Sequence, residues 1–248
     1  MKISKKLVDA TLATGLPPID MRFYPCDDQS GRTVAYYAMQ IINSVEFGVL
    51  TPADFRVVAG RTNQAVRLAE KALDKTMLEL RRREITTGDY DYVMVEVPRR
   101  MLEDGSLLDD LEGRMASGDF TVRGRLCVLF SAEVLLTDPE KTVPRLEELL
   151  SLGIHIGLTD FGDESTATLR LPLFPFEVVV LDPSVSKLLG EGMERALGAV
   201  VGFAEGVGAS VYMQGELTED QRARAFAAGV RGVFTPNVIY REEVKSDA

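Results

Sequence analysis

The chain has only two cysteines and one histidine, and these shortages limit the kinds of site it can contain. Cys26 and Cys127 lie far apart and form no Cys-x-x-Cys motif. We therefore expect reduced thiols in the core of a cytoplasmic protein. His155 has no cysteine, serine or acid at catalytic spacing, which favours a structural role. The sequence offers no nucleophile–base pair from which to infer an enzymatic mechanism.

Long apolar runs and an excess of basic residues are also missing. No segment reaches the roughly 20 apolar residues that span a membrane. Residues 7–16, which follow three N-terminal lysines, are too short and too mixed for an export signal. The formal net charge is −10, from 28 basic and 38 acidic residues. An acidic surface repels phosphate backbones and anionic lipids, so we expect neither nucleic acid nor a membrane as partner.

The remaining composition is that of a globular protein. The 248 residues are 46% apolar and 27% charged, which is typical of a chain with a large buried core. This length fits one α/β barrel or two small domains.

The hydrophobic pattern favours the single barrel. Two short strands at the start are joined by the five turn residues 27–31, which predicts an antiparallel hairpin. Later strands are separated by segments of helix length, which predicts parallel pairing. We expect strands at 21–26, 32–42, 90–97, 125–130, 154–158, 177–181, 210–213 and 232–234. We expect helices from Thr51 onward and at 64–83, 107–117, 132–152 with a break near 138, 183–205 and 218–228.

Polar residues follow several of these strands. Asp160 comes where the strand 154–158 ends, and Glu96, Asp182 and Gln214 stand at the ends of three others. In α/β barrels the chemistry lies at the carboxyl ends of the strands. Asp160 either caps the turn that follows it or belongs to a ligand pocket. Asp182, just before Pro183, fits a helix N-cap better than a ligand.

Four motifs, in this order and spacing, resemble those of a known family. Residues 153–162, Gly-Ile-His-Ile-Gly-Leu-Thr-Asp-Phe-Gly, resemble the Leu-Gly-Val-x-Ile-Ala-Leu-Asp-Asp-Phe-Gly stretch of EAL domains. These domains are the cyclic di-GMP phosphodiesterases of bacterial second-messenger signalling. Residues 48–55, 180–182 and 215–221 are similar to the family's Gly-x-Ile-x-Pro-x-x-Phe, Lys-Ile-Asp and Glu-Gly-Val-Glu-Thr motifs.

The resemblance covers about residues 21–236 and has consequences for the fold. It implies a TIM-like (β/α) barrel of EAL type with one antiparallel strand near the N-terminus, as the predicted hairpin requires. We accordingly expect an N-terminal leader over 1–20, a single barrel domain over 21–238 and a charged tail over 239–248.

The departures from the family pattern fall on the residues that the family uses for catalysis. Tyr37 replaces the metal-binding glutamate of Glu-Ala-Leu, and Val180 replaces the catalytic lysine. The other replaced positions are Tyr24 for glutamine, Ile41 for the dinucleotide-binding arginine, Glu96 for the metal-binding asparagine, Phe130-Ser131 for Thr-Glu, Thr159 for the first aspartate and Gln214 for glutamate. The chain thus resembles a degenerate member of the family that lacks most catalytic residues.

These replacements lead to a prediction for the site. We expect no catalytic residues, with vestigial ligand or metal positions at Tyr37, Glu96, Asp160, Asp182 and Gln214. We expect no cofactor, and Mg²⁺ or Mn²⁺ only if Glu96 and Asp160 together hold one ion weakly. The mouth of the barrel should be filled by apolar side chains and tyrosines, including Tyr24, Tyr36, Ile41, Phe130 and Val180, with Tyr37 hydrogen-bonded to a remaining acid.

Three functions remain open. The first is a catalytically inactive signalling or interaction module in cyclic di-GMP-linked regulation, which acts through a protein partner or through self-association as a homodimer. The second is a receptor that binds cyclic di-GMP without hydrolysis. The third is an enzyme, either a weak cyclic di-GMP phosphodiesterase or one with a different chemistry.

Overall fold

The computed structural model describes residues 19–44, 48–59, 64–86, 89–116, 123–162, 167–189 and 194–236. The expected tail over 239–248, and all but the last two residues of the expected leader, lie outside these ranges. The proposed limits of the leader, the domain and the tail therefore stay predictions.

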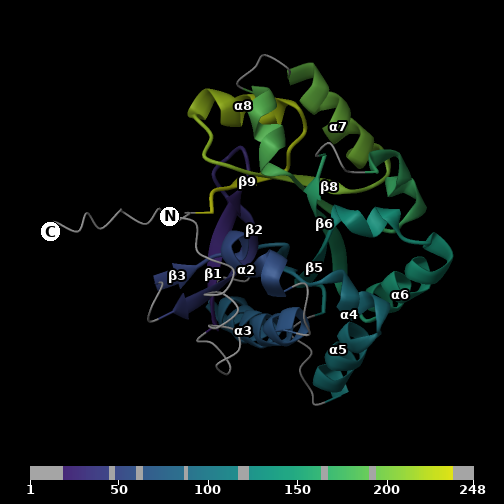
Figure 1. The fold of residues 1–248 in the computed structure, drawn as a ribbon. Coiled ribbons are helices and arrows are strands. Elements are labelled where there is room, and N and C mark those ends of the chain that lie inside the picture. The colour runs from purple at the N-terminus through teal and green to yellow at the C-terminus, as the bar shows by residue number, and fades with distance from the viewer. Residues whose placement is uncertain are drawn as a thin grey trace, which may run out of the picture.

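The strands form one sheet that closes on itself, as Figure 1 shows. The order along the sheet is β1-β9-β8-β7-β6-β5-β4-β2-β3, and a further pairing of β1 with β2 closes a barrel of eight strands, to which β3 is added. The strands are β1 (Ile19–Asp27), β2 (Thr33–Ser44), β3 (Gly48–Leu50), β4 (Tyr92–Glu96), β5 (Leu126–Ser131), β6 (His155–Phe161), β7 (Val178–Leu181), β8 (Ser210–Gln214) and β9 (Gly232–Phe234). The predicted barrel is confirmed.

The predicted N-terminal hairpin is also confirmed. Strands β1 and β2 pair antiparallel from Ile19↔Ile42 to Asp27↔Thr33, whereas β2 pairs parallel with β4. The turn is held by Asp28, whose carboxylate accepts hydrogen bonds from the Ser30 hydroxyl (2.6 Å) and from the backbone N–H of Ser30 (2.8 Å). The Ser30 hydroxyl in particular lowers the pKa of Asp28. Gly31 completes the turn at φ +80°.

Helices cover the outside of the barrel (Figure 1). They are α2 (Pro52–Ala59), α3 (Gln64–Thr86), α4 (Arg99–Glu103), α5 (Ser106–Ala116), α6 (Pro139–Ser151), α7 (Glu194–Gly206) and α8 (Glu219–Ala227), with 3₁₀ helices η1 (Ala132–Leu136), η2 (Thr168–Leu173) and η3 (Pro183–Leu189). The helix expected over 183–205 instead begins as η3, and its α-helical part starts at Glu194. Among the described residues, no helix is long and apolar enough to cross a membrane.

Side chains satisfy backbone donors at the start of two helices. At α2, the Asp54 carboxylate accepts a hydrogen bond from the Thr51 backbone N–H at 2.9 Å. At α8, Thr218 and Gln221 form a reciprocal capping box, in which each side chain accepts from the other residue's N–H. These bonds satisfy backbone donors that the first helical turn leaves without a partner.

Helix α3 is fixed against the hairpin by one arginine. The Arg83 guanidinium lies 3.9 Å from the Tyr36 ring centroid and 5.3 Å from that of Phe23, and it pairs with Glu79 at 3.0 Å. Basic residues in the last turn of a helix complement its dipole. Arg83 also packs its cation on aromatic faces, an interaction worth about 0.5–2 kcal/mol.

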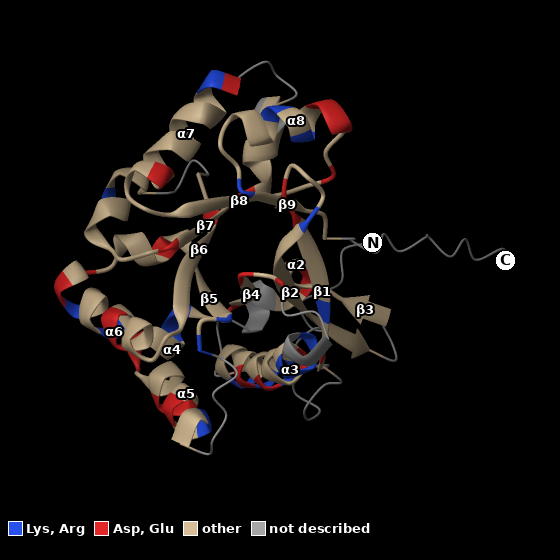
Figure 2. Cartoon of the chain, turned by 180° about the vertical axis from the view of Figure 1, so that it is seen from behind, with Lys and Arg blue, Asp and Glu red and all other residues tan. Residues whose placement is uncertain are grey.

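Two apolar layers result from this arrangement. The outer layer lies between the strands and the helices and includes Phe130, Leu158 and Phe161. The inner layer fills the barrel and includes Tyr24, Ile41, Tyr37, Met94, Val180, Tyr212 and Phe234. Figure 2 shows charged residues gathered on the helices, whereas the strands carry mostly uncharged residues.

One glycine sets the distance between two strands of the barrel. A Cβ atom on Gly157 would lie 2.7 Å from Cβ of Val178 and 2.8 Å from Cδ2 of Leu129. These contacts are too short for any larger residue, so β6 can approach β7 only with glycine here.

Candidate functional site

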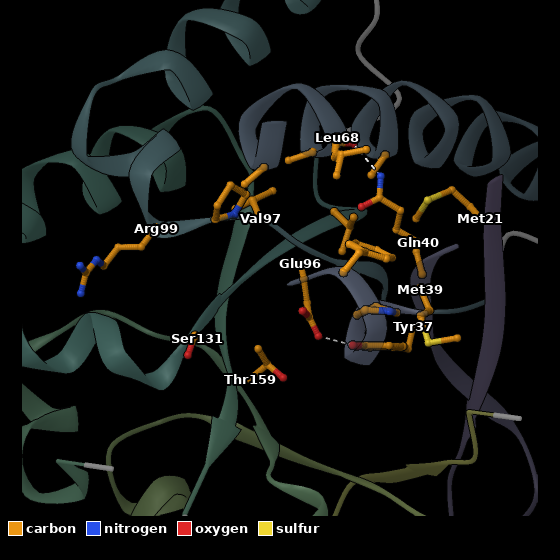
Figure 3. A pocket seen from close by; sticks show the side chains of 18 of the residues that line it. Met21, Tyr37, Met39, Gln40, Leu68, Glu96, Val97, Arg99, Ser131 and Thr159 are labelled. Carbon is orange, nitrogen blue, oxygen red and sulfur yellow. Dashed lines mark hydrogen bonds between the residues drawn. The ribbon is translucent and has the colours of Figure 1, made fainter. Parts of the chain in front are cut away.

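A cavity of about 210 Å³ opens at the mouth of the barrel and continues beneath α3 (Figure 3). Strands β2, β4, β5 and β6 form one wall, and helices α2 and α3 form the other. The lining residues that matter below are Tyr37, Gln40, Phe55, Ala65, Leu68, Ala69, Ala72, Glu96, Arg99, Ser131, Glu133 and Thr159.

The polar side of this cavity is organised by a tyrosine and a glutamate. The Tyr37 hydroxyl donates a hydrogen bond to Oε1 of Glu96, as drawn in Figure 3. The two side chains meet because β2 and β4 are parallel neighbours that pair Tyr37 with Met94 and Ala38 with Val95. Tyr37 is 5% exposed, and its ring stacks on Phe234 with centroids 4.6 Å apart. The predicted bond between Tyr37 and a remaining acid is therefore confirmed for Glu96.

Thr159 contributes an unsatisfied polar atom to the same wall. Its side chain is 2% exposed, and its Oγ1 has no hydrogen-bond partner among the described residues. Thr159 pairs with Ser131 of the neighbouring strand, and both residues line the cavity. A buried hydroxyl without a partner destabilises a fold by about 1–3 kcal/mol.

The opposite side of the mouth is filled. Val180 of β7 is fully buried, and Phe234 of β9 is 1% exposed. Tyr212 of β8 is also fully buried, and its hydroxyl reaches toward the opposite end of the barrel, where Tyr92 begins β4. The Tyr212 hydroxyl lies 3.4 Å from that of Tyr92, and burial raises the pKa of Tyr212 well above its usual range. Val180 thus occupies the packed interior of the barrel, where a lysine ammonium would have no water.

Asp160 does not line the cavity. It is half-buried at φ +58°, a conformation that non-glycine residues rarely adopt, and the pairing of β6 with β7 is irregular between Leu158 and Phe161. This local backbone interrupts the regular alternation of side chains along β6 at Asp160.

Neither of the other two predicted positions lines the cavity. Asp182 caps η3, because its Oδ1 accepts a hydrogen bond from the Ser184 N–H at 2.7 Å, as expected for an N-cap. Gln214 is half-buried at the end of β8, where it pairs with Phe234. Within the described ranges, no three His, Cys, Asp or Glu residues form a group placed to hold a metal ion.

Two expectations about the mouth were wrong in direction. Tyr36 lies outside the barrel, where its ring packs edge-on against Tyr90 at 5.5 Å and beneath Arg83. Phe130 belongs to the outer layer as well. Successive side chains of a strand point to opposite faces, so the neighbours Tyr37 and Leu129 take the inward positions instead.

The helical wall of the cavity was not anticipated. Ala65, Ala69 and Ala72 of α3 face it, with Leu68 between them. The signal available in the sequence was their spacing of four and three residues, which places small side chains on one face of a helix.

The single histidine lies at the other end of the barrel. His155 begins β6, with Nδ1 2.9 Å from Oε2 of Glu177 and its ring 5.0 Å from that of Tyr92. These contacts support the expected structural role. Both cysteines are fully buried, and burial raises their pKa well above the usual range, so neither is a reactive thiol.

The barrel with its one antiparallel strand is the architecture of a family that comparison identifies. Residues 17–233 match the family model of the EAL domain, so this chain belongs to the EAL domain family. It is 26% identical over 191 residues to the uncharacterized protein Rv1357c of Mycobacterium tuberculosis. That alignment covers 74% of this chain and 62% of the mycobacterial protein, so the chain spans less than two thirds of this relative.

Solved structures of similar fold include complexes with cyclic di-GMP. The PaMucR phosphodiesterase in its c-di-GMP complex superposes with a TM-score of 0.79 at 18% identity, over 88% of this chain and 89% of that one. The FimX EAL domain from Pseudomonas aeruginosa, bound to c-di-GMP, gives a TM-score of 0.78 at 14% identity, over 94% of each chain. At these identities the likeness shows the fold alone.

Proposed function

We propose that this EAL domain acts in cyclic di-GMP-linked bacterial signalling as an interaction module that does not hydrolyse the dinucleotide. The observation that carries the proposal is the hydrogen bond from the Tyr37 hydroxyl to Glu96. Tyr37 stands where the resemblance places a metal-binding glutamate, and Glu96 stands where it places a metal-binding asparagine. Here these two positions satisfy each other.

The electrostatics of this pair disfavour a metal ion. Mg²⁺ and Mn²⁺ prefer several oxygen ligands, most of them carboxylates. Tyr37 supplies a neutral hydroxyl whose proton faces Glu96, and Asp160 is not among the residues that line the cavity. A cation at Glu96 would have one carboxylate and would displace the tyrosine proton. These residues do not fit the pair of ions on which the family's hydrolysis depends, so no step is assigned to a metal.

The position of the family's lysine supports the same proposal. Val180 is fully buried in the inner layer beside Tyr212 and Phe234. An aliphatic side chain can neither orient a water molecule nor move a proton.

An exposed apolar surface favours action through protein contacts, including self-association. Leu136 of η1 and Leu169 and Leu173 of η2 are 59%, 84% and 53% exposed. The two short helices are tied together, since Arg170 donates from Nη2 to the Thr137 carbonyl at 2.8 Å. Clustered exposed leucines are typical of an interaction surface. In the adjoining segment, Phe174 and Phe176 are buried.

The test combines catalysis, binding and assembly. The full chain is incubated with cyclic di-GMP and Mg²⁺ or Mn²⁺, and the linear dinucleotide is measured beside an active EAL phosphodiesterase. We expect none above the no-protein control. Linear product that disappears in Asp160→Asn would overturn the proposal.

Calorimetry and light scattering then separate the remaining functions. Saturable heat from cyclic di-GMP without product would make the chain a receptor instead. Self-association is supported if the molar mass measured by light scattering rises with protein concentration and if the Leu136→Ser/Leu169→Ser double variant has a lower mass at the same concentration. The matched control is Leu78→Ser, because Leu78 on α3 is 69% exposed.

A further inference from the structure

A groove lies on the outside of the barrel, between α6 and the pair of helices α4 and α5. Its volume is about 480 Å³, within the range of about 300–1,000 Å³ that is typical of binding sites. The floor is apolar, since Leu102, Leu107 and Leu149 are at most 3% exposed and Leu108 is half-buried beside them. The helices and the turn that form the groove belong to the described ranges 89–116 and 123–162.

Five charged residues line the groove, and they differ in whether they are already engaged. Three have partners: Asp104 with the Ser106 hydroxyl at 2.7 Å, Lys141 with Asp138 at 3.7 Å and Arg145 with the Leu102 carbonyl at 2.7 Å. The carboxylates of Asp109 on α5 and Glu148 on α6 form neither a hydrogen bond nor an ion pair with any residue that the structure describes. A positively charged occupant would therefore meet one unpaired carboxylate on each wall.

The helices around the groove give it a negative electrostatic potential. Helix α5 carries three acidic residues and one basic residue, and α6 carries three acidic and two basic residues. The base of α5, Arg114, is held by Asp110 at 2.8 Å and by Asp74 at 2.6 Å. Figure 2 shows acidic residues along both helices. Such a surface attracts a cationic segment and repels an anionic one.

The chain itself contains a segment of complementary chemistry. Residues 2–8, Lys-Ile-Ser-Lys-Lys-Leu-Val, carry three lysines and no acidic residue, although the whole chain has a net charge of −10. Ile3, Leu7 and Val8 lie among these lysines in the sequence. The segment lies outside the described residues. Its interleaved cationic and apolar side chains match an apolar floor between acidic walls.

The topology of the barrel brings the groove within reach of this segment. Ile19 of β1 pairs with Ile42 near the end of β2, and α4 begins just beyond the end of β4, so both points lie at the mouth end of the barrel. Strands β1, β2 and β4 are successive neighbours, so β1 and β4 are about 10 Å apart. One helix diameter outward adds about 10 Å. The connecting residues 9–18 can span up to about 36 Å.

We propose that residues 2–8 dock in the groove between α5 and α6 of the same chain. The lysine ammonium groups pair with Asp109 and Glu148, and Leu7 and Val8 cover the apolar floor. Ion pairs at a protein surface contribute little by themselves, so both kinds of contact are needed. The proposal goes beyond the proposed function and does not depend on it, because it needs neither a dinucleotide nor a partner protein.

Zero-length carbodiimide cross-linking of the full chain tests the contact directly, because it joins an amine only to a carboxylate that touches it. We expect mass spectrometry to identify Lys2, Lys5 or Lys6 joined to Asp109 or Glu148. A mixture of isotope-labelled and unlabelled chains shows whether each link lies within one chain, as expected. Links between labelled and unlabelled chains would place a second copy in the groove and overturn the proposal. The absence of any link to these two acids would overturn it as well.

Matched variants separate the groove from the general acidity of the surface. A fluorescent peptide of residues 1–12 is titrated into the full chain carrying Lys2→Glu/Lys5→Glu/Lys6→Glu, in which the chain's own segment no longer competes. Adding Asp109→Asn/Glu148→Gln should weaken peptide binding about tenfold. The control is Glu112→Gln/Glu147→Gln, because these exposed acids lie on the same two helices and do not line the groove. Equal losses in the two double variants overturn the proposal.

A second peptide tests the apolar contact. It carries Ile3→Ser, Leu7→Ser and Val8→Ser, keeps all three lysines, and should bind about tenfold more weakly because its apolar side chains no longer cover the floor. Equal affinity of the two peptides would mean that charge alone attracts the segment, and it would overturn docking in the groove.

These outcomes remain distinct from those of the proposed function. Product assays and cyclic di-GMP titrations decide the absence of hydrolysis and leave the cross-links to be judged separately. The Leu136→Ser/Leu169→Ser variant should keep the same cross-links, because neither leucine lines the groove. Loss of the cross-links in that variant would make docking depend on self-association and would overturn the proposal.

Discussion

The two sides of the barrel mouth differ in their packing at the positions where the EAL family has polar catalytic residues and this chain has other residues. On the side of β7 and β9, Val180 and Phe234 are at most 1% exposed and continue the packed interior. On the side of β2, β4 and β6, Glu96 and Thr159 border a cavity of about 210 Å³. Tyr37 belongs to both, because its ring stacks on Phe234 while its hydroxyl bonds to Glu96.

The difference shows that an apolar replacement can have two results. Where an inward position has other apolar side chains within reach, the replacement joins the core and is stabilised by burial, at about 25 cal/mol per Å². Where the facing element is a helix lined with alanines, as α3 is, the space persists. The filled side should therefore resist substitution, and the open side should tolerate it.

The largest expected effect comes from Val180→Lys on the filled side. An unpaired ammonium in the barrel interior should lower the free energy of unfolding by about 3–5 kcal/mol. At pH 7 the unfolded chain binds a proton on this lysine that the folded state excludes. Near pH 10 the lysine of the unfolded chain also begins to lose its proton, so the loss of stability should be smaller there. Urea unfolding beside wild type at pH 7 and pH 10 measures both. A loss below about 1 kcal/mol would mean that this side is not filled.

Tyr37→Glu should give the next largest effect, at the boundary between the sides. It removes the hydroxyl donor and places a second carboxylate against Glu96, which should cost about 2–3 kcal/mol. The control is Tyr36→Phe, since the neighbouring ring lies outside the barrel. Thermal melts with and without Mn²⁺ decide the result. A melting temperature of Tyr37→Glu that rises with Mn²⁺ would show that one substitution restores a metal site.

Phe234→Leu should cost about 1–2 kcal/mol, because it removes the ring that stacks on Tyr37 and leaves unfilled volume. Chemical unfolding measures the loss. Phe226→Leu on α8 serves as the control, as this ring is only half-buried. If the two variants lose equal stability, the stack contributes nothing specific.

The smallest effect is expected for Thr159→Val on the open side. Removal of an unsatisfied hydroxyl should leave stability unchanged or raise it by up to about 1 kcal/mol. The matched control is Thr142→Val, because the Thr142 hydroxyl lies 2.8 Å from that of Thr137 and its loss should cost about 1 kcal/mol. Equal losses in both variants would indicate that Thr159 has a partner after all.

The sequence was most informative where the physics is local. The turn at Asp28, the capping box of Thr218 and the alternation of strand and helix follow from neighbouring residues, and they led to the barrel. The Tyr37–Glu96 bond could be predicted because both side chains face the centre of the same barrel end.

Other features depend on details that a sequence pattern does not determine. The outward direction of Tyr36 and Phe130 depends on strand register, where a shift of one residue reverses the face. The short β3 and α4 have too few residues for a periodic pattern. The cavity beneath α3 depends on how closely two elements far apart in sequence approach, so alanine spacing alone did not reveal it.

The antiparallel strand β1 makes this barrel nearly an open sheet. Along β2 it pairs from Ile19 to Asp27, yet toward β9 it pairs only at Asp27↔Val233. The stack of Tyr37 on Phe234 joins β2 to β9 across this narrow seam, so side chains complete a closure that the backbone leaves weak. Displacement of the Tyr37 ring should therefore also weaken the contact between β2 and β9 that helps to close the barrel. Amide hydrogen exchange should begin along β1 and β9, and a ligand held beside Tyr37 should slow it there first.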